Sequence, residues 1–310
     1  MGVVRLFDKK NFQNFIEAVQ VGDGVSRDGM SVFWLFGEKP AQQLDVLTIE
    51  EAISQGYLNF KEKPQATVPT AKVENRGKEY VFLLGGEILV GGLQDRVLAT
   101  DVLLAPESKP VDLSVYCVEQ GRWGGERPNI KTSENFSAPS MRSQIAAKRG
   151  QNAVWNSVQK FSQDTKTDSA THAYREIYEK AEVQKHIGEV ERAIDFNIAQ
   201  GAQGAAIFID GTLAGIDIFE DPSLFKREWR KILRASAMAM YGRSPHKRED
   251  EQQLRKSVKE ILKEAASAEI VSRSNAGTGW VLEFQVGKHQ GTALDHEGHI
   301  LHTAIHAPTN

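Results

Sequence analysis

Hydrophobic residues in the first 123 positions fall in short runs separated by turns, a pattern typical of β-strands. The clearest runs lie at 31–36, 80–84, 97–104 and 113–118. Two short helices are expected between turns, at 12–21 and 49–55, the second followed by Gly56, a residue favoured just past a helix end. This part of the chain is therefore predicted to form a β-rich sandwich or barrel-like sheet.

Helical spacing replaces the strand pattern after a polar break at 124–139. Asp210-Gly211 between two apolar runs then predicts a β-hairpin, and Asp221-Pro222 marks the start of a helix. The other elements predicted in this half are helical segments at 139–158, 172–200 and 249–266 and strands near 280–286 and 299–304.

These elements predict an α+β protein in two parts. Residues 1–138 form the β-rich part, which carries the polar motif described below. Residues 139–310 form an α+β part with a helical middle and a C-terminal hairpin-helix-helix-strand unit. The two parts are expected to pack together, because neither the break at 124–139 nor the polar stretch at 162–171 has the composition of a flexible linker.

The charge balance limits the partners of this chain. Its 38 basic and 41 acidic residues give a net charge of -3, whereas a dedicated nucleic-acid binder normally carries a strongly basic face. Nucleic acid is therefore not expected as a partner. The basic residues within 226–234 and 243–248 are interpreted as solvated helix faces.

Membrane and disulfide signals are missing from the sequence. No apolar run approaches the roughly 18–20 residues needed to span a bilayer, and the N-terminal segment lacks a signal-peptide pattern. The single cysteine, Cys117, excludes an intramolecular disulfide. We therefore expect a cytoplasmic protein that has no membrane partner.

Polar residues interrupt the apolar strands between positions 80 and 123, where two Gly-Gly pairs also occur. A Gly pair within a strand marks a bulge or a close approach to the backbone. The polar residues are Glu87, Gln94, Asp95, Arg96, Cys117, Glu119, Arg122 and Trp123. We expect them to form a polar cluster on a rigid sheet.

Glu87 and Glu119 are the candidate catalytic residues. Each lies at a strand end near Gly, where partial burial raises the pKa of a carboxyl group. The two carboxyls can act as general acid and base, or share a metal ion. The alternative is structural: both pair with Arg96 and Arg122 in a buried ionic network.

Gln94, Asp95 and Arg96 form a polar turn that has two interpretations. As ligand-binding residues, the amide and the guanidinium hold a phosphate or ribose while Asp95 accepts a hydroxyl. As structural residues, the three close the turn and cap a strand. The loop GGEILVGG is not a strict phosphate-binding loop, since no Lys-Ser/Thr follows it.

Cysteine and histidine chemistry is not favoured. Cys117 lies mid-strand and is predicted to be a small buried hydrophobe. In a strand His299 and His302 point to opposite faces, and His302 and His306 lie roughly 13 Å apart. The C-terminal histidines are therefore interpreted as an incidental feature of the tail, and no metal site is assigned.

The segments around the polar residues resemble a bacterial domain family of uncharacterised function. It is named for its association with ADP-ribosylglycohydrolase and rhodanese/phosphatase-superfamily genes. The matching segments are GGEILVGGLQDRVL, DVLLAPES, VYCVEQGRW, the helix at 151–158, AAIFIDGTLAGIDIFEDPSLFKREWRKIL and, more weakly, GHILHTAI. The resemblance carries over no catalytic residue, but it implies a link to ADP-ribose, NAD-derived nucleotides or RNA repair in a bacterial defence setting.

Two functions are therefore kept open. In the first, the protein binds or processes a nucleotide-like small molecule related to ADP-ribose or NAD. Glu87 and Glu119 then supply acid–base or metal contacts, Gln94, Asp95, Arg96 and Arg122 hold the ligand, and Trp123 stacks on a base. In the second, the protein is a non-enzymatic interaction module whose polar cluster is an internal brace. The sequence identifies no cofactor.

Overall fold

The computed structural model describes residues 9–38, 40, 43–61, 70–122, 130–194, 198–243 and 250–309. Its largest element is an eight-stranded antiparallel sheet. The strand order is β1 (Gln20–Arg27), β2 (Met30–Phe36), β12 (Gly204–Ile209), β13 (Thr212–Phe219), β17 (His299–His306), β16 (His289–His296), β15 (Gly279–Val286) and β14 (Ile270–Ala276). This sheet thus joins strands from both ends of the chain.

Two smaller sheets are built from the polar-motif region and its neighbours. The six-stranded sheet has the order β11 (Lys131–Phe136), β7 (Glu87–Val90), β8 (Arg96–Leu98), β10 (Val111–Cys117), β5 (Thr70–Asn75) and β4 (Leu58–Lys61). The three-stranded sheet has the order β3 (Val46–Leu47), β6 (Tyr80–Leu83) and β9 (Val102–Leu104). The predicted α+β class with a β-rich N-terminal part is confirmed.

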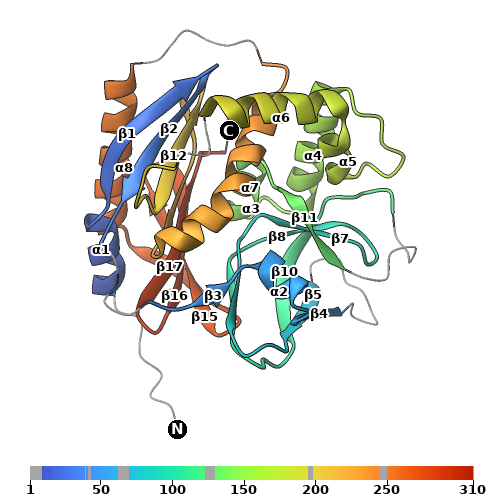
Figure 1. Ribbon diagram of the computed structural model, residues 1–310, viewed down its shortest axis with the longest axis horizontal. Coiled ribbons are helices and arrows are strands. Elements are labelled where there is room, and N and C mark those ends of the chain that lie inside the picture. Colours follow the sequence, from blue (N-terminus) through green and yellow to red (C-terminus); the bar gives the residue numbers. More distant parts are fainter. Residues whose placement is uncertain are drawn as a thin grey trace.

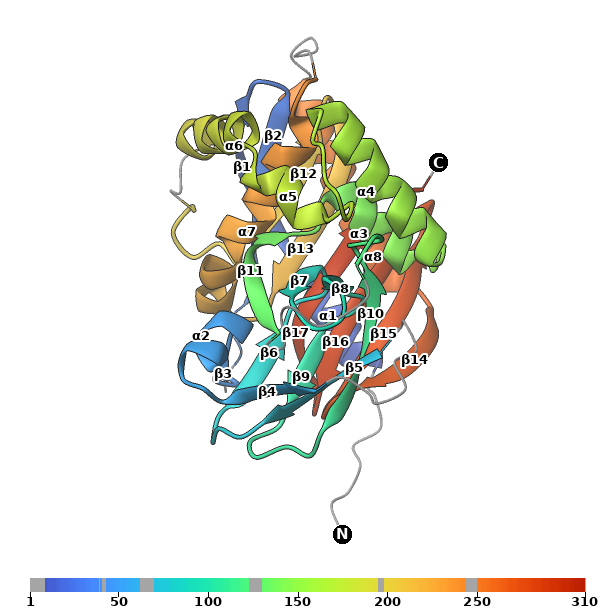
Figure 2. The same cartoon turned by 90° about the vertical axis from the view of Figure 1, so that its right-hand side faces the viewer.

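Helices cover both faces of the large sheet. The helices of the described residues are α1 (Lys9–Glu17), α2 (Ile49–Ser54), α3 (Pro139–Ala146), α4 (Gln151–Thr165), α5 (Tyr174–Glu179), α6 (Ala181–Ile194), α7 (Pro222–Met240) and α8 (Glu251–Ser267), and only some of them lie against the large sheet. Figure 1 shows α1 and α8 on one side of the sheet, with α7 and the smaller sheets on the other. In Figure 2, α4, α5 and α6 lie above the smaller sheets. No helix within the described residues is long and apolar enough to cross a membrane.

Local signals in the last third of the chain produce the predicted elements. Asp210 and Gly211 both have positive φ, the conformation that a tight two-residue hairpin requires, and they join β12 to β13. The carboxylate of Asp221 accepts hydrogen bonds from the backbone N–H groups of Ser223 and Leu224, at 2.8 and 3.1 Å, and so caps α7. Both predictions are confirmed.

The apolar run at 97–104 is not one strand, as predicted, but two strands in different sheets, β8 and β9. Asp101 lies between them and points inward. Its Oδ1 accepts a hydrogen bond from the Gly85 backbone N–H at 2.7 Å, and its Oδ2 lies 2.7 Å from Nδ1 of His302. The strand breaks because this carboxylate is bound to the large sheet.

His302 is the centre of a buried ionic network that ties the smaller sheets to the large one. Its Nε2 lies 3.2 Å from Oδ1 of Asp217, and the side chain is 0% exposed. Arg142 of α3 donates two hydrogen bonds to the Asp217 carboxylate, at 2.6 and 3.0 Å. The interpretation of the C-terminal histidines as an incidental tail is therefore wrong for His302.

Hydrogen bonding fixes the charge of this network. A carboxylate only accepts hydrogen bonds, so both ring nitrogens of His302 must carry protons. Burial alone would lower the pKa of His302, but the carboxylates of Asp101 and Asp217 outweigh it and raise the pKa to about 9. Burial would raise the pKa of Asp217, yet Arg142 and His302 hold it below its usual range. The network of two acids and two bases is therefore neutral overall.

Removing one member of the network should lower the stability of the folded protein. We expect Asp217→Asn to lower the free energy of unfolding by about 3–5 kcal/mol, because it leaves the buried charges of Arg142 and His302 without their counter-ion. Urea denaturation measures the change. Asp112→Asn is the control: Asp112 is half exposed and 3.3 Å from Lys72, so it should cost at most about 1 kcal/mol. Equal effects of the two variants would contradict a bracing role.

The same network makes stability depend on pH. The folded pKa of His302 is about 9 against an ordinary value of 6.5, so its contribution is complete below pH 6.5 and is lost as the pH rises through 9. We expect the free energy of unfolding of the wild type, relative to His302→Gln, to fall by about 3 kcal/mol across that window. Urea midpoints at a series of pH values measure it. Parallel curves for the two proteins would contradict a charged His302.

Candidate functional site

The two predicted catalytic glutamates lie in different places. Leu89 on β7 and Cys117 on β10 both pair with Arg96 on β8. Glu87 precedes Leu89 by two positions and Glu119 follows Cys117 by two, so the glutamates are four positions apart along the strands, or about 13 Å, and two strands apart. This separation is too large for one metal ion to bridge, and each glutamate belongs to its own cluster.

The first cluster is built around the fully buried Asp95. Its Oδ1 accepts hydrogen bonds from the Gly91 backbone N–H and from Arg122, both at 3.0 Å. Its Oδ2 accepts a hydrogen bond from Nε of Arg175 at 2.8 Å. Burial raises the pKa of Asp95 despite these donors. Both carboxylate oxygens are engaged, and the contact with Gly91 closes the turn between β7 and β8.

Glu119 completes this cluster from the end of β10. Its Oε2 accepts hydrogen bonds from Nε of Arg122 at 2.8 Å and from the Asp95 backbone N–H at 3.1 Å, and its Oε1 accepts one from Thr171 at 2.9 Å. Burial favours the neutral acid, but these donors, Arg122 first, hold the pKa of Glu119 below its ordinary value. Arg175 is the second base of the cluster, and it also pairs with Glu176 at 3.2 Å and with Glu179 at 2.9 Å.

Gln94 forms hydrogen bonds between the β7–β8 turn and the end of β10. Its amide N–H donates to the backbone oxygen of Glu119 at 2.9 Å, and its Oε1 accepts from the thiol of Cys117 at 2.8 Å. Gln151 of α4 in turn binds both backbone groups of Cys117. Cys117 is 0% exposed, which confirms its prediction as a buried residue.

Two of the predicted ligand-binding residues, Arg96 and Trp123, are not among the residues that form the Asp95 cluster's described contacts. Arg96 is 1% exposed and lies in the middle of the six-stranded sheet, between β7 and β10. Trp123 lies outside the described residues. The structure therefore brings together Gln94, Asp95, Glu119 and Arg122, and it separates Glu87 from them.

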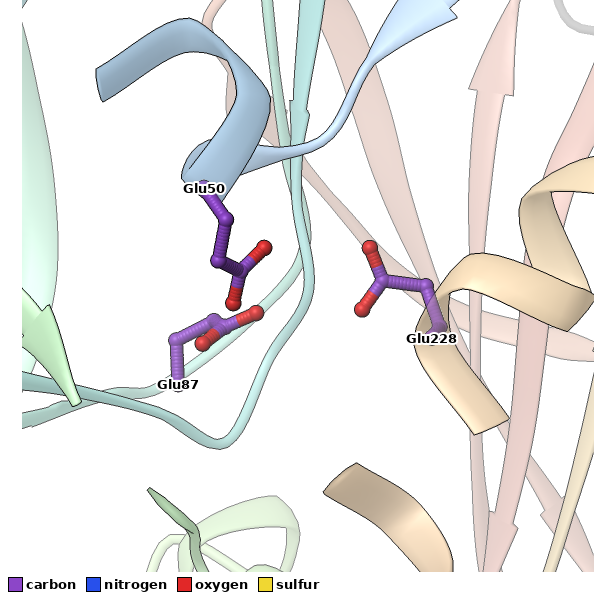
Figure 3. A group of neighbouring side chains, drawn as sticks. All are labelled: Glu50, Glu87 and Glu228. Atoms are coloured by element: carbon purple, nitrogen blue, oxygen red, sulfur yellow. The ribbon is translucent and has the colours of Figure 1, made fainter. Parts of the chain in front are cut away.

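The second cluster gathers Glu87 with three residues that the sequence did not single out. Glu50 comes from α2, Glu87 begins β7, and Glu228 lies on α7; Figure 3 shows their carboxylates converging. The ammonium of Lys231 lies 2.7 Å from an oxygen of Glu50 and 2.7 Å from one of Glu228, and it is hydrogen-bonded to Oε1 of Glu87. We call Glu50, Glu87, Glu228 and Lys231 the acidic cluster.

The acidic cluster is not neutral. With all groups ionised, three carboxylates and one ammonium leave a net charge of minus two, and the neighbouring Arg227 is already paired with Glu51 at 2.6 Å. Burial is the main cause that raises the pKa of Glu87 well above its ordinary value, and burial also raises that of Glu228. Burial would lower the pKa of Lys231, but the facing carboxylates outweigh it and raise it.

Two buried oxygens of the acidic cluster have neither a hydrogen bond nor an ion pair among the described residues. Oε2 of Glu87 and Oε1 of Glu228 accept no hydrogen bond within the described part of the chain, although both residues are 0% exposed. Buried carboxylate oxygens without a partner are costly and rare. Glu50, by contrast, has 41% of its side chain exposed and connects the cluster to solvent.

The sequence held a signal for two of these residues. Glu228 lies four positions after Leu224 and four before Ile232, on the buried stripe of α7, where a charge is out of place. Lys231 lies three positions further and can reach it. The interpretation of 226–234 as a solvated face is wrong for Lys231 and for Arg234, since both are buried in ion pairs. Glu50 carries no such signal.

The fold and these clusters define an α+β protein whose polar centres are enclosed by its sheets and helices. A family model matches residues 18–306, and the chain belongs to that family, the ARG and Rhodanese-Phosphatase-superfamily-associated Protein domain. The resemblance predicted from the sequence is confirmed. Comparison with curated proteins and with solved structures finds no match.

The Asp95 cluster should behave as a brace. We expect Arg122→Met to lower the free energy of unfolding by about 2–3 kcal/mol, because it leaves Asp95 and Glu119 buried with one base fewer. Arg243→Met is the matched control, since Arg243 is half exposed and 3.6 Å from Asp210, and it should cost at most about 1 kcal/mol. Thermal and urea unfolding measure both. An unchanged stability of Arg122→Met would leave Arg122 available for a ligand instead.

Proposed function

We propose that this protein binds and processes a nucleotide-like ligand related to ADP-ribose, with the acidic cluster as its reactive centre. One observation carries the proposal: every carboxylate oxygen of the Asp95 and His302 clusters has a hydrogen-bond donor, whereas the acidic cluster has one ammonium for three carboxylates and two oxygens with neither a hydrogen bond nor an ion pair among the described residues. Buried groups with strongly shifted pKa values are typical of functional sites.

The groups of the cluster suit acid–base chemistry. Burial raises the pKa of Glu87 well above its ordinary value, which favours the protonated carboxyl that can donate a proton to a leaving oxygen. A neighbouring ionised carboxylate, from Glu228 or Glu50, can accept a proton from an attacking water. The ammonium of Lys231 can stabilise negative charge that develops on the substrate.

The ligand class comes from the family. The name of the family associates it with ADP-ribosylglycohydrolase genes, which supports a ligand of the ADP-ribose or NAD type and a bacterial defence or repair setting. Such a ligand offers phosphates, which are ordinary partners of Arg side chains. Arg96, Arg122 and Trp123 remain predictions as ligand contacts in this proposal, and Glu119 remains one as a second catalytic carboxyl.

Turnover tests the proposal. The purified protein is incubated with NAD, ADP-ribose and its phosphorylated forms, with and without divalent metal, and products are read by mass spectrometry. We expect a product whose formation falls by about a hundredfold or more in Glu87→Gln and Glu228→Gln. Glu191→Gln is the control, because Glu191 is a buried glutamate that is fully paired with Arg230 and Arg234, outside the acidic cluster. No product from any of these ligands, or equal rates in all variants, would contradict the proposal.

A second function is favoured by the Asp95 cluster, whose carboxylates are engaged by the protein itself. Under this alternative the protein is a non-enzymatic interaction module, and the acidic cluster is a third brace beside the His302 and Asp95 clusters. Neither the wild type nor Glu87→Gln would then form any product. Glu87→Gln would lose stability by about 3 kcal/mol, as when a buried pair is broken.

A further inference from the structure

We propose that Glu50, Glu87 and Glu228 together bind one divalent cation of the Mg²⁺ or Mn²⁺ type, and that the Lys231 ammonium is the tethered cation that it replaces. The inference deepens the proposed function and rests on it for its catalytic meaning. Binding of the ion itself can be tested without any nucleotide.

The positions of the oxygens fit an ion of this size. One oxygen from each glutamate lies within 4.8 Å of the other two. Ligands on opposite sides of Mg²⁺ are about 4.2 Å apart, and adjacent ligands about 3 Å, since each metal–oxygen distance is about 2.1 Å. Small side-chain rotations therefore bring all three into a coordination sphere. The three glutamates come from different elements, so the folded chain preorganises them (Figure 3).

The oxygens without donors point to a missing partner. Oε2 of Glu87 and Oε1 of Glu228 are buried and accept no hydrogen bond from the residues that the structure describes. Lys231 has only three N–H donors, and one of its contacts goes to each glutamate, so it cannot serve the second oxygens as well. A cation beside them supplies the interaction that they lack.

Charge and ligand type select the kind of ion. With all three carboxylates ionised, the cluster has an excess of two negative charges, which one divalent cation cancels, and the ion then takes the place of the proton that burial favours on Glu87. All three ligands are carboxylates, without His or Cys, and such a set favours Mg²⁺, Mn²⁺ or Ca²⁺ over Zn²⁺ or Cu²⁺. Three protein ligands leave positions for water or for phosphate oxygens, which is how Mg²⁺ commonly joins a protein to a nucleotide. Glu50 has 41% of its side chain exposed and is therefore the ligand that lies on the solvent side of the cluster.

The test is a titration of the protein with Mn²⁺ alone, followed by the loss of the electron paramagnetic resonance signal of the free ion. We expect one bound ion per chain. Glu50→Gln, which alters the exposed ligand and should fold normally, is expected to weaken binding at least tenfold, as is Glu228→Gln. Glu191→Gln should bind as the wild type does.

Lys231→Met separates a cation site from a brace. If the ammonium competes with the ion, its removal should tighten Mn²⁺ binding about tenfold, and Mn²⁺ should raise the melting temperature of the variant more than that of the wild type. If Lys231→Met does not fold, the wild type and Glu50→Gln still decide the question.

The outcomes are distinct. No Mn²⁺ binding by the wild type at millimolar concentration, or equal binding by Glu50→Gln, would overturn the site whether or not a nucleotide is turned over. Mn²⁺ binding without nucleotide turnover would uphold the site and contradict the proposed function. Nucleotide turnover without Mn²⁺ binding would uphold the proposed function and overturn the cation site.

Discussion

The charged His302 is the constraint on which the rest of this structure depends. It lies on the large sheet, and its two nitrogens bind carboxylates from two different parts of the chain, Asp101 and Asp217. A buried imidazolium is stable only with both partners in place. The position of Asp101 in turn divides one apolar run into β8 and β9 and sets where the six-stranded sheet, with the candidate residues on it, meets the large sheet.

The supply of hydrogen-bond donors distinguishes the His302 and Asp95 clusters from the acidic cluster. In the His302 and Asp95 clusters every carboxylate oxygen accepts a hydrogen bond from a group of the protein. Such networks brace a structure. The acidic cluster around Glu87 differs in charge, in its two oxygens without donors in the described chain, and in its contact with solvent through Glu50. These differences are the basis of the proposed function.

Local signals in the sequence were enough for the class of fold and for several elements. The Asp210-Gly211 hairpin and the α7 cap at Asp221 depend on residues that are adjacent in the chain, and the family resemblance depends on contiguous segments. The clusters depend on distant pairs instead. His302 meets Asp101 across 201 positions, and Lys231 meets Glu87 across 144. Periodicity and spacing carry no information at that range, so Glu87 was found as a candidate without its partners.

Crystals soaked in Mn²⁺ provide the most direct test that the acidic cluster is the ligand-binding centre. The account predicts an anomalous scattering peak among the carboxylates of Glu50, Glu87 and Glu228, with the Lys231 ammonium moved away from its present contacts. An ammonium that stays between the three glutamates, with no peak beside it, would contradict the account and leave the cluster as a third brace.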